Sequence, residues 1–163
     1  MATHTAKIKW AAKESGEEFL KGRFSRAHEV SFDGGTVIPA SASPHVVGKW
    51  AVEAAVDPEE MFVAALSSCH MLSFLHLARV AGFAVRAYDD HAEGVTEEIA
   101  PGRLAVTKVE LRPKIEWAGA APTKEQLDRL HHGAHEICFI ANSVKTQVTV
   151  ADMAEDTSKT HLA

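Results

Sequence analysis

The stretch DPEEMFVAALSSCH, residues 57–70, decides the fold of this chain. Asp57 is a good N-cap, Pro58 suits the first position of a helix, and Glu60 completes a capping box with Asp57. Downstream, Gly82 suits the residue that follows a helix end. The pattern therefore predicts a helix over residues 58–81. Because apolar residues occur on most of its sides, we expect this helix to be buried in the middle of the fold.

A membrane span is the alternative interpretation of the same segment. From Met61 to Ala78 the chain carries no Asp, Glu, Lys or Arg, which is just long enough to cross a bilayer. Ser67, His70 and His76 interrupt it with polar groups, so a buried core helix is the better interpretation. The N-terminus lacks the long apolar run of a signal peptide. We therefore expect a cytoplasmic protein with no membrane association.

Length and composition set the class of protein. The chain has 163 residues, of which 46% are hydrophobic and 24% charged, which is typical of a globular protein with one core. We expect a single domain over residues 1–163, with a polar tail from about residue 155. A net charge of −5 argues against nucleic-acid binding, which usually requires a basic face.

Strand patterns lie on both sides of the helix. The segments that alternate or are rich in strand formers are residues 4–12, 26–32, 36–38, 83–98, 103–117 and 144–151. The run Asp33-Gly34-Gly35 is a strong hairpin signal. Residues 13–25 are polar and suit a turn, and residues 39–56 suit an ordered loop.

The second half of the chain adds a second helix. Apolar and charged residues alternate in residues 109–117, as expected for one buried and one solvated face of an antiparallel sheet, and Pro113 implies an edge or a bulge. Thr123 and Gln126 form a capping box for a helix whose apolar stripe begins at Leu127. The order of strands, helix, strands, helix and strand predicts an α+β fold, with antiparallel sheets packed around a central buried helix.

The two cysteines, Cys69 and Cys138, have three competing interpretations. At about 100° per residue, Cys138 lies within roughly 20° of the stripe that begins at Leu127, so it points inward. Both cysteines are then buried structural residues, or ligands of a metal, or a redox pair. For the metal, His131 and His135 would join Cys138 at helical spacing, although the pattern lacks a paired C-x-x-C.

The two cysteine segments resemble the OsmC/Ohr family of hydroperoxide reductases, and the match is nearer to the OsmC-like branch. Residues 57–69 are similar to the family signature, in which a Pro-Glu pair stands ten residues before a helical cysteine. Residues 134–143 are similar to its second cysteine motif, and the separation of the cysteines also fits. One departure is Phe139, where many members have proline. The resemblance covers roughly residues 5–152.

The resemblance implies roles for four residues. Cys69 would be the peroxidatic thiolate and Cys138 the resolving thiol. Glu59 matches the glutamate of the family. The family's arginine comes from the N-terminal strand region, where Arg26 is favoured over Arg23 because it begins a strand.

The separation of Glu59 and Cys69 along the predicted helix indicates a second subunit. Ten helical residues separate Glu59 from Cys69, which is about 15 Å along the axis and roughly 80° off the same face. A glutamate side chain cannot span that distance. We therefore expect Glu59 and the arginine to come from the partner in an intertwined homodimer, which the resemblance also implies.

The resemblance implies the reduction of organic hydroperoxides to alcohols, with hydrogen peroxide as a second candidate substrate, through a Cys69 sulfenic acid and a Cys69–Cys138 disulfide. Phe62, His28 and Phe139 would line an apolar substrate pocket. An external dithiol, in the family often a dihydrolipoyl protein, would reduce the disulfide, with no metal or organic cofactor. The alternatives are an OsmC-like protein without peroxidase activity that binds a metal or a small hydrophobic ligand.

Overall fold

The computed structural model describes residues 1–151, so the expected polar tail lies outside the described residues. The chain divides into two compact units, residues 1–62 and the residues from Val63 onward, with the boundary inside the long helix α3. Each unit is described by itself below. That the chain forms a single domain stays a prediction.

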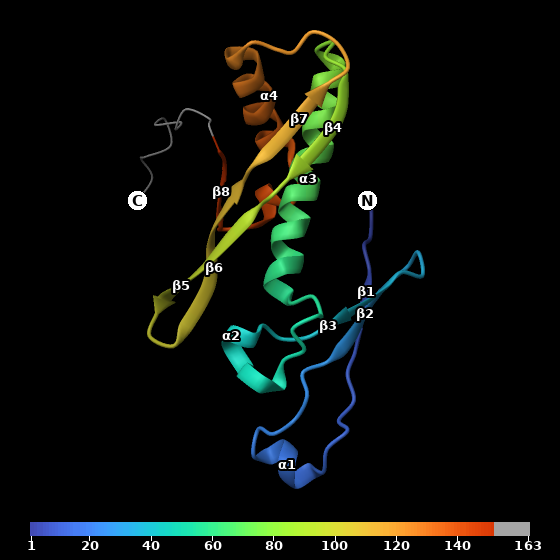
Figure 1. The fold of residues 1–163 in the computed structure, drawn as a ribbon, viewed down its shortest axis with the longest axis vertical. Coiled ribbons are helices and arrows are strands. Elements are labelled where there is room, and N and C mark those ends of the chain that lie inside the picture. Colours follow the sequence, from blue (N-terminus) through green and yellow to red (C-terminus); the bar gives the residue numbers. More distant parts are fainter. Residues whose placement is uncertain (152–163) are drawn as a thin grey trace. The chain divides into compact units, whose positions relative to one another are not determined.

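The first unit contains a three-stranded antiparallel sheet in the order β1-β2-β3 (Figure 1). Its strands are β1 (Ala6–Lys9), β2 (His28–Phe32) and β3 (Val37–Ala40). Gly35 turns the chain between β2 and β3 with a φ of 83°, and the Phe32 N–H donates to the Thr36 carbonyl at 3.0 Å. The hairpin predicted from Asp33-Gly34-Gly35 is therefore confirmed.

Short helices occupy the two segments that the sequence analysis treated as turn and loop. They are α1 (Gly16–Leu20), α2 (Pro44–Val47) and the 3-10 helix η1 (Gly48–Trp50). Serine caps explain two of them, because the Ser15 side chain accepts from the Glu18 N–H and the Ser43 side chain accepts from the His45 N–H. Helices this short were hidden from hydrophobic periodicity, so the prediction of a plain turn and loop was wrong there.

The helix α3 (Pro58–Val80) begins as its capping sequence predicts. The Asp57 N–H donates to Glu60 Oε2 at 2.9 Å, and the Glu60 N–H donates to Asp57 Oδ1 at 2.7 Å. These two bonds form a reciprocal capping box. After the helix, Gly82 takes a φ of 84°, the left-handed conformation that glycine adopts readily.

The second unit contains two small sheets where the sequence predicted two long strands. Its strands are β4 (Val85–Asp90), β5 (Glu93–Ala100), β6 (Arg103–Leu111), β7 (Pro113–Trp117) and β8 (Gln147–Val150). Antiparallel β4 and β7 form one sheet, and β5-β6-β8 forms the other. Each predicted long strand is thus broken once and contributes to both sheets, as Figure 1 shows.

Asp90 holds the point where the chain leaves one sheet for the other. The Arg112 N–H donates to Asp90 Oδ1 at 2.7 Å, and the Ser67 hydroxyl of α3 donates to Asp90 Oδ2 at 2.5 Å. Pro113 is the first residue of β7, a position where its missing N–H costs no ladder bond. The break therefore follows from the contact of Asp90 with Arg112, 22 residues later in the chain, and from the proline at position 113.

The last strand departs from the expected antiparallel arrangement. β8 pairs with β6 in parallel, from Lys108 opposite Gln147 to Leu111 opposite Val150. The helix α4 (Lys124–Ile137) and the 3-10 helix η2 (Ala141–Ser143) lie between β7 and β8 in the chain. A connection of this length allows a strand to return in the same direction, whereas a short hairpin does not.

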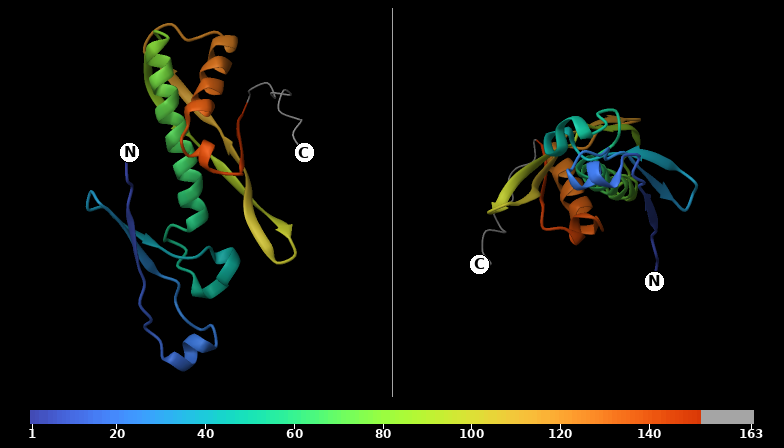
Figure 2. Two further views of the ribbon diagram at one scale, coloured as in Figure 1. Left: turned by 180° about the vertical axis from the view of Figure 1, so that it is seen from behind. Right: turned by 90° about the horizontal axis from the view of Figure 1, so that it is seen from below.

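The core of the second unit forms where α3 and α4 pack together (Figure 2, left). Its buried members are Phe74, Ala78, Leu130 and Ala134. Phe83, Tyr88 and Trp117 extend this core toward β4 and β7. The expected α+β fold with a central helix is therefore confirmed.

Burial of α3 is one-sided in the single chain. Its buried residues are Leu66, His70, Phe74 and Ala78, which share one face at a spacing of four. Leu72 is 60% exposed and Val80 is 64% exposed. One copy of the chain therefore leaves part of α3 uncovered, although the composition of this helix is apolar on most sides.

By length and composition alone, α3 is also long and apolar enough to cross a membrane. The same test is passed by the core helix of a soluble protein. Phe74 and Ala78 pack against α4, and the charged Arg79 lies in the last turn. These contacts favour the core-helix interpretation made from the sequence.

Candidate active site

The structure brings the two cysteines together in the second unit. Cys69 lies near the middle of α3 and is half-buried, whereas Cys138 ends α4 and is 1% exposed. Neither is in a disulfide, and their side chains are joined by a hydrogen bond. The apolar stripe of α4 thus turns Cys138 inward, as its helical spacing predicted.

The end of α4 shapes the surroundings of the Cys138 sulfur. Cys138 leaves the helical conformation, with φ −71° and ψ 109°, and the chain turns back over it. The Ala141 N–H donates to Cys138 Sγ at 3.4 Å, and the Asn142 N–H donates to the Cys138 carbonyl at 3.0 Å. A backbone donor thus faces the sulfur from the turn after the helix.

Burial holds the Cys138 thiol in its protonated form. Burial raises the pKa of the Cys138 thiol, the hydrogen bond with Cys69 raises it further, and the Ala141 N–H opposes this change. The proton therefore stays on Cys138, where the thiol is able to donate to the Cys69 sulfur. The less buried Cys69 is left as the sulfur that meets a reagent first.

A pair of buried histidines, His70 and His131, lies on the two helices that carry the cysteines. His70 Nε2 and His131 Nδ1 are 3.1 Å apart, and the two rings are nearly parallel at 8°. His131 also stacks on Phe74, with ring centroids 4.5 Å apart. His70 is 1% exposed and His131 is 4% exposed. His70 is therefore both packed and hydrogen-bonded.

Burial keeps both histidines neutral. Burial, together with the nearby His131 and His135, lowers the pKa of His70 to about 3. It also lowers the pKa of His131 to about 4, although Asp128 and Asp90 act in the opposite direction. This pairing was not predicted from the sequence, in which its signal is the spacing of four that places His70 on the buried stripe with Leu66 and Phe74.

The described structure does not bring His131, His135 and Cys138 together as a set of metal ligands. Within residues 1–151, no group of three or more His, Cys, Asp or Glu side chains is placed to hold a metal ion. The physical reason is that Nδ1 of His131 faces His70 and that its ring stacks on Phe74.

The two candidate arginines differ in how they are held in the first unit. The Arg26 guanidinium lies over the Phe24 ring at 3.4 Å, and its Nη1 donates to the Phe24 carbonyl at 2.5 Å. The Arg26 N–H also donates to the Trp50 carbonyl at 3.0 Å. Arg23 faces Glu18 at 3.7 Å on the surface. Arg26 is therefore the more fixed of the two cations.

The remaining predicted site residues divide between the units. His28 opens β2 and its Nδ1 lies 2.9 Å from the Arg26 carbonyl, while Glu59 and Phe62 belong to the first turns of α3. All three are in the first unit. Phe139, in the second unit, follows Cys138 and is 81% exposed. Glu59 takes no part in the Asp57–Glu60 capping box.

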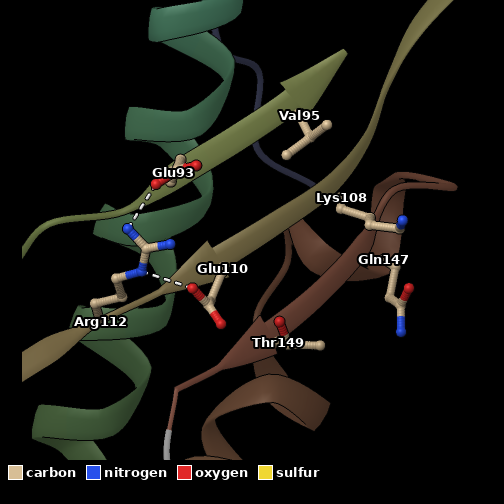
Figure 3. Close-up of a pocket in the computed structure, with 7 residues that line it drawn as sticks. All are labelled: Glu93, Val95, Lys108, Glu110, Arg112, Gln147 and Thr149. Carbon is tan, nitrogen blue, oxygen red and sulfur yellow. Dashed lines mark hydrogen bonds and ion pairs between the residues drawn. The ribbon is translucent and has the colours of Figure 1, made fainter. Parts of the chain in front are cut away.

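A shallow hollow of about 300 Å³ lies on one face of the β5-β6-β8 sheet, away from these residues in the chain (Figure 3). It is lined by Glu93, Val95, Lys108, Glu110, Arg112, Gln147 and Thr149. Arg112 is ion-paired with Glu93 and with Glu110, each at 2.6 Å. Because this cation is already paired twice, the hollow is a solvated face of the sheet and offers no unpaired cation to an anion.

Comparison with known proteins identifies the family. The model of the family described as OsmC-like protein matches residues 51–151. The structure is also similar to an OsmC-like protein of unknown function from Vibrio cholerae, with 51% sequence identity and a TM-score of 0.86 over 92% of this chain and 98% of that chain. This chain belongs to the OsmC-like family. The resemblance noted in the sequence is therefore confirmed.

More distant OsmC-like structures share the fold. One is an organic hydroperoxide resistance protein from Elizabethkingia anophelis, 20% identical with a TM-score of 0.66, over 92% of this chain and 96% of that chain. Another is an organic hydroperoxide resistance protein, OsmC, from Legionella pneumophila, 20% identical with a TM-score of 0.60, over 92% of this chain and 98% of that chain. No curated protein matches the chain.

Proposed function

We propose that this OsmC-like protein is a thiol-dependent peroxidase that reduces organic hydroperoxides. The observation that carries the proposal is the hydrogen-bonded pair of free thiols, half-buried Cys69 and buried Cys138. The Cys69 thiolate attacks the O–O bond, takes one oxygen to become a sulfenic acid, and releases an alkoxide that gains a proton as the alcohol. Cys138 then condenses with the sulfenic acid to form a disulfide and water.

The different burial of the two sulfurs supports this division of roles. A peroxide must reach the attacking sulfur, and Cys69 is the more exposed of the two. The resolving thiol needs protection until the sulfenic acid forms, and the buried Cys138 keeps its proton. The nearby Ala141 N–H is placed to stabilise the Cys138 thiolate when it attacks.

Arg26 and Glu59 complete the proposed site. A guanidinium near the Cys69 sulfur favours the thiolate and can hold the peroxide oxygens, and Glu59 would orient that guanidinium by a bidentate pair. The packing of Arg26 against Phe24 supports its choice over Arg23, because it limits the motion of the cation. Phe62, His28 and Phe139 would supply the walls of the substrate pocket.

A homodimer is part of the proposal. The exposed Leu72 and Val80 lie on a helix that is apolar on most sides, and a second copy of the chain would cover them. The partner subunit would then bring its own Arg26 and Glu59 to the site. Sedimentation should find a dimer, and a stable monomer with full peroxidase activity would contradict this part of the proposal.

An external dithiol, such as a dihydrolipoyl protein, would return both cysteines to thiols in the cytoplasm. The decisive experiment is the consumption of cumene hydroperoxide with dihydrolipoamide as reductant. We expect Cys69→Ser to abolish turnover, and we expect Cys138→Ser to accumulate sulfinic acid at Cys69. Unchanged turnover in Cys69→Ser would refute the peroxidase and leave the binding of a small hydrophobic ligand as the function to test.

A further inference from the structure

The His70–His131 pair lies on the same two helices as the cysteine pair, but the peroxidase chemistry does not use it. His70 directly follows Cys69 on α3, and His131 stands seven residues, or about two turns, before Cys138 on α4. The two rings meet through one hydrogen bond between Nε2 and Nδ1, at 3.1 Å. Each helix therefore presents a histidine and a cysteine to the other.

This hydrogen bond adds a directional contact to the apolar packing between α3 and α4. The neighbours of the pair include Phe74, Leu130 and Ala134, which pack without a preferred angle. A hydrogen bond fixes both distance and direction, and an unpaired ring nitrogen in this position would remain without water. The pair therefore fixes the position of α4 relative to α3 along the helix axes.

The register of the helices matters because disulfide closure has strict geometry. A disulfide requires Cβ atoms about 3.5–4.5 Å apart with a defined torsion, and a small shift of one helix along the other removes that alignment. Stacking of His131 on Phe74 adds a second restraint on the same ring. Both restraints act on α4 upstream of Cys138.

We propose that the His70–His131 hydrogen bond positions Cys138 for attack on oxidised Cys69, so that the disulfide closes before a second peroxide reacts. This inference rests on the proposed peroxidase function. Two reactions compete for the Cys69 sulfenic acid. The Cys138 thiol converts it to a disulfide and water, whereas a second hydroperoxide converts it to a sulfinic acid and an alcohol. The histidines are positioning residues and touch neither reactant.

The depressed pKa values of His70 and His131 agree with this role, because burial holds both rings neutral at ordinary pH. One neutral ring donates its N–H and the other accepts it. The His70–His131 hydrogen bond thus stays in place throughout the reaction, because neither ring gains a proton.

The main test is the double variant His70→Phe with His131→Phe. It keeps two stacked rings and removes both partners together, so it leaves no buried nitrogen unpaired and should fold. The reduced protein is treated with excess cumene hydroperoxide, alkylated, and analysed by mass spectrometry. We expect the first oxidation of Cys69 to keep its rate, and the ratio of sulfinic acid to disulfide to rise about tenfold or more.

A matched pair of single variants gives an independent readout. The amide of His131→Asn occupies the place of Nδ1, whereas the amide of His131→Gln occupies that of Nε2, and both are polar and similar in size. Because His131 uses Nδ1, we expect Asn to keep the ratio near that of the native protein, and we expect Gln to raise it as the double variant does.

The outcomes separate the two proposals. If native Cys69 is not oxidised by the hydroperoxide, the peroxidase itself fails. If it is oxidised, and either the double variant gives the native ratio or Asn and Gln give equal ratios, the positioning role is overturned. If His131→Gln raises the ratio of sulfinic acid to disulfide and His131→Asn leaves it at the native value, the positioning role is supported. This holds even if the double variant does not fold.

Discussion

Acid should destabilise this protein through its buried histidine pair. Burial lowers the pKa of His70 to about 3 and that of His131 to about 4, against a value of 6.5 for a histidine in an unfolded chain. At a pH between the unfolded pKa and the two folded pKa values, the two histidines bind protons in the unfolded chain but not in the folded protein. The free energy of unfolding therefore stays high above about pH 6.5 and falls as the pH drops below it toward the folded pKa values.

The magnitude follows from proton linkage. From about pH 7 to about pH 5, a histidine with an unfolded pKa of 6.5 that stays neutral in the folded protein lowers the stability by about 2 kcal/mol. The pair together should cost on the order of 4 kcal/mol, which is a large part of the stability of a typical small domain. The free energy of unfolding should therefore fall strongly at pH values that are still above those at which carboxylates gain protons.

The assay is urea denaturation of the reduced protein, followed by circular dichroism, at about pH 7 and about pH 5. The control is the variant in which both His70 and His131 are phenylalanine. His135, Asp128 and Asp90, which act electrostatically on the pair, remain in both proteins. The native protein should lose about 4 kcal/mol more than the variant, and equal losses would refute the reasoning.

Three further predictions concern packing in the second unit. A Cβ at Gly94 would lie 2.6 Å from Cγ2 of Val63, so Gly94→Ala should cost about 1–3 kcal/mol in urea denaturation, and adding Val63→Ala should restore part of it. Phe74 is fully buried, so Phe74→Ala should cost about 3–5 kcal/mol, and a loss below 1 kcal/mol would contradict its place in the core. The buried Tyr88 hydroxyl has no hydrogen-bond partner among residues 1–151, so Tyr88→Phe should keep or raise the thermal unfolding temperature.

Local signals in the sequence were enough to locate the two main helices. Asp57 with Glu60 and Thr123 with Gln126 form the predicted capping boxes, and both appear in the structure. Caps depend on residues three apart, so sequence reveals them directly. The inward direction of Cys138 likewise follows from helical spacing alone.

Contacts between distant segments could not be predicted in the same way. The alternating pattern of residues 103–117 continues across Arg112, yet the strand breaks there because Asp90, 22 residues earlier, accepts the Arg112 N–H. The parallel pairing of β8 with β6 has no local signature either, since alternation is the same in both directions. The His70–His131 contact joins residues 61 positions apart and required the packing of two helices.

The hydrogen bond between Cys69 and Cys138 joins positions that are 69 residues apart in the chain. A disulfide between them would close nearly half of the chain into a ring and would restrict the unfolded state by about 4 kcal/mol. Under the proposed chemistry, each turnover would alternate between a linear chain and a ringed one. Exposure to hydroperoxide would then leave the protein harder to unfold, and the reductant would return it to its less stable form.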